Sequence, residues 1–379
     1  MPNDSSQHAP RIRYEALDGL RGVAALVVVL HHGLLVSPEL ATASYAGGAG
    51  SPDSWVWWAT FTPLHLAWAG KEAVYIFFVL SGFVLALPFV GASQPRWTTY
   101  FWKRLLRIYP PVWASLVFAA GSVWLVPRVT SPDFSPWINL HDERARMLTD
   151  ALLLWGAGSL NSPLWSLQWE MAFSLLLPLY VVFVNRPRRS WLPAMAALVL
   201  LICLFELIHL TEAAYLLMFA VGALMAASSE TLRKWGTGLH RCRQWAAVIG
   251  ASLILLCSRW IIPTPVPVGL AVTGAALLVF VCIAWKPAVG LRQNLFAHWL
   301  GLRSFSLYLV HEPIIVSVAL GLRTSDALSV CFVAIPLSFL ASEVFFRLVE
   351  RPSHHLSRAV GKAWDERMRH REQKLTQRP

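Results

Sequence analysis

The stretch LDGLRGVAALVVVLHH, from Leu17 to His32, decides the fold because ionisable side chains stand at both ends of an apolar run. Ten residues separate Arg21 from His32, so a helix turns about 1100° and rises about 16 Å between them. Arg21 and His32 then lie within about 20° of each other on one face, whereas His31 points about 80° away. Asp18 falls on the same side, one turn earlier. Because ionisable groups in a hydrocarbon-length segment are costly, we expect a functional site here.

The composition is typical of a polytopic membrane protein. Of the 379 residues, 56% are apolar and only 14% are charged, and the 19 tryptophans suit a chain with long membrane interfaces. The five cysteines are scattered, with no CxxC pair, so the sequence predicts neither a disulfide framework nor a metal site. The polar start over residues 1–15 leads directly into the charged first span, so we expect this span to be retained and not cleaved as a signal peptide.

Apolar segments long enough to cross a bilayer, roughly 17 to 25 residues each, occur about ten times. They lie near 17–37, 72–91, 109–127, 163–185, 191–209, 213–229, 246–262, 268–286, 304–322 and 327–348. The sequence therefore predicts an all-α, polytopic membrane helix bundle of about ten transmembrane helices. We divide it into a cytoplasmic polar tail (1–15), a transmembrane domain (16–350) and a basic cytoplasmic tail (351–379).

The distribution of basic residues predicts the orientation of the bundle. If the N-terminus is cytoplasmic, 26 of the 32 Lys and Arg residues fall in inside segments and six in outside segments. This strong positive-inside asymmetry predicts that both termini are cytoplasmic. The net charge of +11 is then a consequence of topology, and we do not expect nucleic acid as a partner. Two long outside loops, 38–71 and 128–162, are candidates for a lid or an acceptor platform.

Small and basic residues mark the second span and the segment after it. Ser81 and Gly82 are typical of close helix contacts, and they also leave room for a ligand. In the amphipathic segment 96–110, Arg104 and Arg107 stand three residues apart and point the same way. Two guanidinium groups at the cytoplasmic interface suit a phosphate group. The pattern alone is more typical of an ordinary interfacial helix that follows the positive-inside rule.

Two later spans carry acidic and imidazole groups. Pro163 suits the first turn of a helix, which places Glu170 about two turns from the outer surface. A lone carboxylate there needs a histidine or arginine from another span, and a structural ion pair is the competing interpretation. The ninth span brings His311 and Glu312 near mid-membrane, beside Pro313, which we expect to loosen the helix. Histidines of this kind are often only hydrogen-bonding residues of a bundle.

Five fragments in this order resemble the acyltransferase-3 family of integral membrane enzymes. They are LDGLRG with His32, FFVLSGF over 77–83, the segment from Arg104 to Pro110, NSPLWSL over 161–167 with Glu170, and SLYLVHEP over 306–313. The resemblance covers about residues 14–352. It implies an O-acyltransferase, usually an O-acetyltransferase, that moves acyl groups from acyl-CoA to hydroxyls of sugars, peptidoglycan, antibiotics or other acceptors.

By this resemblance, His32 is the catalytic histidine and Arg21 is its partner on the first helix. We expect Arg21, Arg104 and Arg107 to bind the co-substrate, acetyl-CoA or another acyl-CoA, with the last two holding its phosphates. The thioester then reaches His32, about 16 Å deeper than Arg21. His32 acts either as a general base on the acceptor hydroxyl or as a carrier of the acyl group.

Other side chains are expected to assist this reaction. Glu170 orients and polarises His32, and His311 assists it or stabilises the oxyanion. Support for the site is expected from four further residues: Asp18, Ser81, Trp165 and Tyr308.

The expected partners are acyl-CoA, the bilayer, and an acceptor that is a carbohydrate, a lipid-linked sugar or a secondary metabolite. The expected location is the inner cell membrane, with modification of cell-envelope polysaccharide as one role. The alternative is a multi-span transporter of a small molecule or glycan, in which the same His, Glu and Arg groups form a proton or substrate pathway. No pair of interrupted helices repeats between the two halves, which speaks against a transporter.

Overall fold

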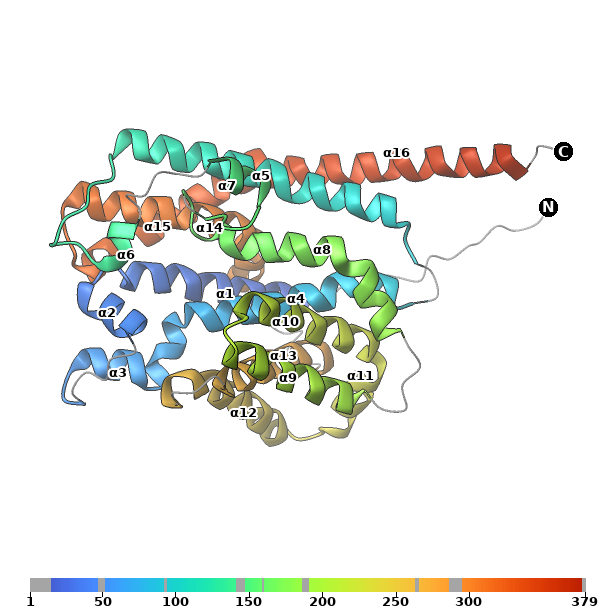
Figure 1. The fold of residues 1–379 in the computed structure, drawn as a ribbon, viewed down its shortest axis with the longest axis horizontal. Helices are drawn as coiled ribbons and strands as arrows, with labels where there is room; N and C mark the ends of the chain where they lie inside the picture. The colour runs from blue at the N-terminus through green and yellow to red at the C-terminus, as the bar shows by residue number, and fades with distance from the viewer. Residues whose placement is uncertain are drawn as a thin grey trace.

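The protein is a bundle of long helices, and every element in the described part of the chain is helical (Figure 1). The structure is a computed structural model that describes residues 15–46, 52–91, 94–140, 147–158, 160–185, 191–262, 266–285 and 295–376. The all-α prediction is thereby confirmed. Most of the predicted N-terminal tail, residues 1–14, lies outside the described residues.

Each of the ten predicted spans coincides with a long helix. These helices are α1 (Glu15–Leu34), α4 (Gly70–Ala86), α5 (Trp97–Leu125), α8 (Leu164–Val184), α9 (Leu192–Leu207), α10 (Thr211–Ala227), α12 (Cys242–Ile261), α13 (Val266–Ala284), α14 (Leu295–Leu322) and α15 (Ala327–Phe345). Seven helices of the described residues are long and apolar enough to cross a membrane, or eight if α10 and the bent α11 (Ser229–Gly238) form one span. Helix α9 has only 16 residues. The total of ten spans, like the cytoplasmic location of the termini, stays a prediction.

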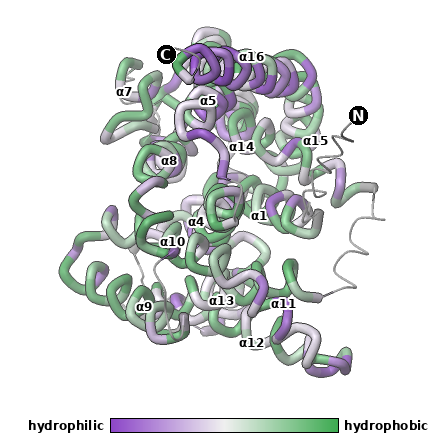
Figure 2. The backbone as a smooth tube through the Cα atoms, turned by 90° about the vertical axis from the view of Figure 1, so that its right-hand side faces the viewer, coloured by the Kyte–Doolittle hydropathy of each residue, from purple (hydrophilic) through white to green (hydrophobic). Residues whose placement is uncertain are grey.

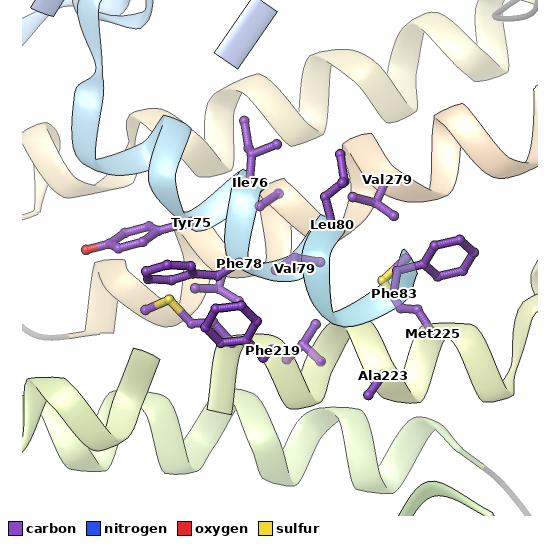
Figure 3. Packing of buried hydrophobic residues seen from close by; sticks show 14 of the residues in the cluster. Tyr75, Ile76, Phe78, Val79, Leu80, Phe83, Phe219, Ala223, Met225 and Val279 are labelled. Carbon is purple, nitrogen blue, oxygen red and sulfur yellow. The ribbon is translucent and has the colours of Figure 1, made fainter. Parts of the chain in front are cut away.

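The centre of the bundle is α4, whose sequence is apolar on nearly every side and which is buried accordingly. It packs against α1, α10 and α13, and Figure 3 shows Phe78 of α4 against Phe219 of α10, with ring centroids 4.6 Å apart. A Cβ atom at Gly82 would lie 2.1 Å from the Phe219 carbonyl oxygen, and one at Gly222 would lie 1.9 Å from the Val79 carbonyl oxygen. Glycine at both positions therefore lets the two backbones touch, in accord with the close helix contact expected at Ser81–Gly82.

Two helices continue through proline, and both begin earlier than the predicted spans 109–127 and 304–322. The segment 96–110 is not a separate interfacial helix: it is the first half of α5, which runs for 29 residues across Pro110 and Pro111. Helix α14 likewise continues for 28 residues across Pro313. Packing of long apolar faces against neighbouring helices compensates for the hydrogen bonds that these prolines remove.

The segment after α15 is not a detached tail. A π-helical turn, η5 (Phe346–Glu350), joins α15 to the 26-residue helix α16 (Arg351–Thr376). Helix α16 packs along α5, and Figure 2 shows it as a hydrophilic helix beside α5 at the edge of a largely hydrophobic bundle. The 351–379 prediction therefore missed a contact between α16 and the membrane domain, which local sequence pattern could not reveal.

The two long outside loops contain short helices. The first holds α2 (Pro38–Ala46), α3 (Trp55–Phe61) and the 3₁₀ helix η1 (Pro63–Trp68), and the second holds α6 (Pro136–Asn139) and α7 (Met147–Leu152). Figure 1 shows α2, α3 and α6 together at one end of the bundle, opposite the far end of α16. Helices α2 and α6 are in contact, so the two loops meet over the end of α1.

Candidate active site

Three cavities follow one another through the bundle. The His32 cavity, of about 450 Å³, is lined by His32, Trp137 and Trp165 among others. The Glu170 cavity, of about 90 Å³, is lined by Arg21 and Glu170, and it shares Tyr308 with the His32 cavity. The Arg358 cavity, of about 400 Å³, shares three residues with the Glu170 cavity: Leu85, Arg104 and Arg107. A narrow middle section thus lies between two wide ones.

His32, on the last turn of α1, is held by a histidine from α14. Its Nδ1 lies 2.8 Å from Nε2 of His311, although 279 residues separate the two in sequence. The Nδ1 of His311 lies 3.0 Å from the carbonyl oxygen of Leu307. A carbonyl can only accept, so the His311 Nδ1 must carry a hydrogen and donate it.

This arrangement assigns the tautomers when both rings are neutral. Because His311 is protonated on Nδ1, its Nε2 is an acceptor, and the hydrogen between the rings belongs to His32 Nδ1. The remaining nitrogen of His32, Nε2, is then unprotonated. His311 is fully buried and His32 keeps a 14% exposed side chain at the cavity wall. Of these two histidines, only His32 can therefore contact a substrate directly.

A carboxylate stands behind the histidine pair. Glu312 lies 3.9 Å from Nδ1 of His32, and its carboxylate accepts hydrogen bonds from the backbone N–H of Ser162, at 2.9 Å, and from the Ser162 hydroxyl. The neighbouring Asn161 donates to the Leu309 carbonyl at 2.8 Å. The Asn161–Ser162 pair thus ties the start of α8 to the His311–Glu312 segment of α14. In the sequence Glu312 stands out only as the neighbour of His311, and no local pattern indicates its role.

Aromatic rings from the two outside loops cover the histidines. Trp137 of α6 stacks on His32, with ring centroids 5.3 Å apart and planes 10° from parallel. His31 also lines the His32 cavity, and its Nδ1 lies 2.9 Å from the Trp68 carbonyl oxygen. Trp137 carried no local signal in the sequence, because its position depends on how the second loop folds back.

A second histidine stack supports the first loop. His65 of η1 lies between Trp68 and Trp260, with both ring centroids 4.2 Å away. Its Nδ1 lies 2.7 Å from the Thr60 carbonyl oxygen. Burial lowers the pKa of His65 to about 4, so this imidazole is neutral at neutral pH. His65 is therefore a structural histidine of the loop.

Glu170 pairs with an arginine and not with His32. Its carboxylate forms an ion pair with Arg104 of α5, and the Arg104 Nε donates to the Ser174 hydroxyl at 2.9 Å. Ser81 completes the group, since its hydroxyl donates to Glu170 at 3.4 Å. Of the two partner types expected for Glu170, the structure contains the arginine. The Arg104 charge is therefore largely neutralised within the bundle.

The other two predicted arginines line the same cavity without such a partner. Arg21 and Arg107 both face the Glu170 cavity, and no carboxylate of the described residues forms an ion pair with either. Arg104 and Arg107 thus share a face of α5, as the spacing predicts, but only Arg107 keeps a guanidinium that is not bound to a carboxylate. This makes the Glu170 cavity cationic on one side.

The predicted supporting residues are spread over the cavities. Ser166 donates to the Pro163 carbonyl at 3.0 Å, so the Tyr308 hydroxyl must donate to Ser166 across their 2.7 Å contact. Tyr308 is thereby fixed at the junction of the His32 and Glu170 cavities, whereas Trp165 lines the His32 cavity alone. Asp18 lines none of the three cavities. No group of three or more His, Cys, Asp or Glu in the described part of the chain is placed to hold a metal ion.

Comparison with known proteins identifies the family of this chain. A family model described as an acyltransferase domain matches residues 14–345. The chain belongs to this acyltransferase family. It is also similar to the acyltransferase MdmB of Streptomyces mycarofaciens, with 26% identity over 391 residues that cover 92% of this chain and 93% of that protein. No solved structure matches the chain significantly.

The acyltransferase is therefore a multi-pass membrane enzyme that transfers acyl groups. The resemblance seen in the five fragments is confirmed by a match that spans nearly the whole chain. The match ends at residue 345, the last residue of α15, so η5 and α16 lie beyond it.

Proposed function

We propose that this acyltransferase moves an acyl group, acetyl in the first instance, from acyl-CoA to a hydroxyl of a carbohydrate or a secondary metabolite. His32 is the general base in this proposal. One observation carries it: the contacts from Leu307 to His311 and from His311 to His32 leave the His32 Nε2 as an unprotonated nitrogen on a side chain at a cavity wall. An imidazole in this state is suited to take a proton near neutral pH.

The proposed reaction balances without a further reactant. His32 Nε2 takes the proton of the acceptor hydroxyl while the oxygen attacks the thioester carbonyl carbon. The tetrahedral intermediate then collapses, the carbon–sulfur bond breaks, and the thiolate of CoA takes the proton back from His32. His311 accepts the Nδ1 hydrogen of His32 throughout and so keeps the ring in one tautomer.

The shapes of the cavities support separate routes for donor and acceptor. The narrow Glu170 cavity suits a thin pantetheine arm, and it joins the Arg358 cavity to the His32 cavity through shared lining residues. The His32 cavity is wide enough for a ring-shaped acceptor. Its wall holds the aromatic side chains of Trp137, Trp165 and Tyr215, and no carboxylate of the described residues belongs to it. Aromatic walls with a few polar groups are typical of sites for organic ligands.

The predicted topology sets the direction of transfer. With both termini in the cytoplasm, the Arg358 cavity opens toward cytoplasmic acyl-CoA and the His32 cavity lies in the outer half of the inner membrane. An acceptor such as a cell-envelope polysaccharide, a lipid-linked sugar or an exported metabolite would then meet His32 from outside. The loops that carry Trp68 and Trp137 would form its platform.

The deciding experiment measures acyl transfer by purified full-length protein in lipid nanodiscs. We expect His32→Ala to lower kcat by about 10²- to 10⁴-fold, the usual contribution of general acid–base catalysis. His298→Ala, at an exposed position of α14, is the matched control and should keep its activity. Size-exclusion elution and thermal unfolding show whether both variants are folded. Full turnover by a folded His32→Ala variant would disprove the proposal.

A further inference from the structure

We propose that α16, the helix beyond the family match, supplies part of the donor site: Lys103, His354 and Arg358 bind the phosphate groups of the nucleotide half of acyl-CoA. This inference rests on the proposed function, because it takes acyl-CoA as the donor. It replaces the expectation that Arg104 and Arg107 alone hold these phosphates.

Half of the described residues that line the Arg358 cavity are lysines or arginines. It lies between α5 and α16, and its wall consists of Leu85, Tyr100, Lys103, Arg104, Arg107, His354, Ser357 and Arg358. Four Lys and Arg side chains thus face a space of about 400 Å³, and no carboxylate of the described residues belongs to its lining. Such a concentration of cations suits a ligand with several phosphate charges. Burial lowers the pKa of His354, whose Nε2 lies 3.7 Å from Glu350, to about 3, so this imidazole is a neutral hydrogen-bonding group of the wall.

Helix α16 is fastened to α5 along the length of this cavity. The Ser357 hydroxyl donates to the Lys103 carbonyl at 2.8 Å, and the indole of Trp364 donates to the Thr98 hydroxyl at 3.1 Å. Further along, Arg96 donates to the Asp365 carbonyl at 3.1 Å. These bonds hold Arg358 at a defined place over the cavity. Because binding side chains are most effective when their support is rigid, the contacts favour a built site over a loose basic tail.

Lys103 reaches the cavity because α16 leaves space for its stem. A Cβ atom at Gly361 would lie 2.0 Å from Cε of Lys103 and 2.9 Å from its Cγ. The absence of a side chain at Gly361 therefore lets the Lys103 stem pass across α16. A lysine kept on the surface by solvation alone would not need such a gap.

Arg104 is already engaged and cannot serve as the main phosphate ligand. Its guanidinium is bound to Glu170 and to Ser174, and only 8% of the residue is exposed. The Lys103 and Arg358 side chains, in contrast, form no ion pair with a carboxylate of the described residues. Charge available for a phosphate is therefore concentrated on the α16 side of the cavity, together with Arg107.

A nucleotide is favoured over a lipid headgroup by the connection of the cavities. Leu85, Arg104 and Arg107 line both the Arg358 and the Glu170 cavities, and Tyr308 continues the path to His32. A ligand whose phosphates rest at Arg358 can thus extend a thin arm toward the catalytic histidine. A lipid headgroup at the same place has no comparable arm that would extend through the Glu170 cavity.

The test compares two donors on full-length protein in neutral phosphatidylcholine nanodiscs: acetyl-CoA, and S-acetyl-pantetheine, which lacks the nucleotide. We expect Arg358→Ala and Lys103→Met each to raise the KM for acetyl-CoA about tenfold, the order expected for losing one charge-assisted contact. The KM for S-acetyl-pantetheine and both kcat values should stay unchanged. Lys103→Met keeps the stem that crosses Gly361, so it tests the charge.

Arg367→Ala is the matched control. It lies nine residues after Arg358 on the same helix, which is two and a half turns and therefore the opposite face. It should leave the KM for both donors unchanged. We expect high salt to raise the KM for acetyl-CoA in the wild type and to raise it less in Arg358→Ala.

Three results would overturn the inference. One is an unchanged KM for acetyl-CoA in the Arg358→Ala, Lys103→Met double variant. Another is a rise in the KM for S-acetyl-pantetheine equal to the rise in the KM for acetyl-CoA. The third is a change in KM that appears only when anionic phosphatidylserine is added to the nanodiscs. That result would mean that Lys103, His354 and Arg358 bind lipid headgroups. Failure of the proposed function is distinguishable, because a dispensable His32 would show full turnover with both donors in the His32→Ala variant.

Discussion

The His32 cavity and the Glu170 cavity are neighbours, yet they are built from different interactions. Around His32 the closest contacts are hydrogen bonds between imidazoles and a backbone carbonyl, covered by the stacked ring of Trp137, and one carboxylate, Glu312, lies 3.9 Å from Nδ1. Around Glu170 the contacts are charged, with an Arg104 ion pair and two further arginines at the wall. The first arrangement leaves a nitrogen able to move a proton, and the second holds charges in fixed places.

This difference indicates that the two cavities have different functions along one path: proton transfer in the His32 cavity and anion binding in the Glu170 cavity. An imidazole works as a base only if nearby charges do not hold it in one protonation state. A cationic cavity attracts an anionic ligand and need not change its own protonation. Separation of the two along α1, from Arg21 to His32, allows each to perform its function. The following predictions test this separation, beginning with the largest expected effect.

Among substitutions at residues other than His32, removal of the Glu170 carboxylate should have the largest effect on the stability and activity of the protein. Glu170→Ala leaves the buried Arg104 guanidinium without its counter-charge, which costs about 3–5 kcal/mol when one partner of a buried pair is lost. We expect a lower thermal-unfolding temperature in detergent and loss of acyl transfer. The Glu170→Ala, Arg104→Ala double variant should recover part of the stability, since it removes the stranded charge.

The control for this prediction is an exposed pair on the bent helix α11. Glu230 lies 3.2 Å from Lys234, and both side chains are more than 70% exposed. Glu230→Ala should lower the stability by less than about 1 kcal/mol. An equal loss of stability in Glu170→Ala and Glu230→Ala would mean that the Glu170–Arg104 pair contributes no more than a surface pair. That result would contradict the proposed difference between the two cavities.

Replacement of His311 should slow the reaction without unfolding the protein. His311→Ala removes the acceptor for the His32 Nδ1 hydrogen, so the ring samples both tautomers, and we expect kcat to fall about 10- to 100-fold. His311→Gln keeps a side-chain acceptor and should recover part of the rate. Steady-state kinetics with unchanged KM values for both substrates would support a positioning role. A rise in KM with constant kcat would contradict it.

Truncation of Trp137 should have the smallest effect and should act on one substrate only. Trp137→Ala removes the ring stacked on His32, a contact worth about 0.5–1.5 kcal/mol. We expect the KM for the acceptor to rise about threefold to tenfold, while the KM for acyl-CoA stays constant. Trp137→Phe retains a ring and should lie near the wild type. An equal change in the KM for acyl-CoA would show that donor and acceptor do not occupy separate cavities.

The long helices and the family could be predicted from the sequence because both depend on local pattern. Each predicted apolar run coincides with a long helix, with α16 as a long helix that has no such run, and five short fragments in order resemble the family whose model matches residues 14–345. The starts of α5 at Trp97 and α14 at Leu295, ahead of the predicted spans 109–127 and 304–322, were missed because packing between helices decides how far a helix extends. The contact of α16 with α5 was also missed, since its residues look like those of a solvated tail.

By itself, the sequence determined that Arg21 and His32 stand on one face of the first helix, because their spacing is a property of a single helix. It also identified polar groups that are too costly to lie in a membrane without partners. Only the tertiary structure decided which residues contact these polar groups. His32 meets His311, Glu170 meets Arg104, and Trp137 covers the pair. Each of these contacts joins helices far apart in the chain, and their relative rotation and depth follow from packing, which no local pattern encodes.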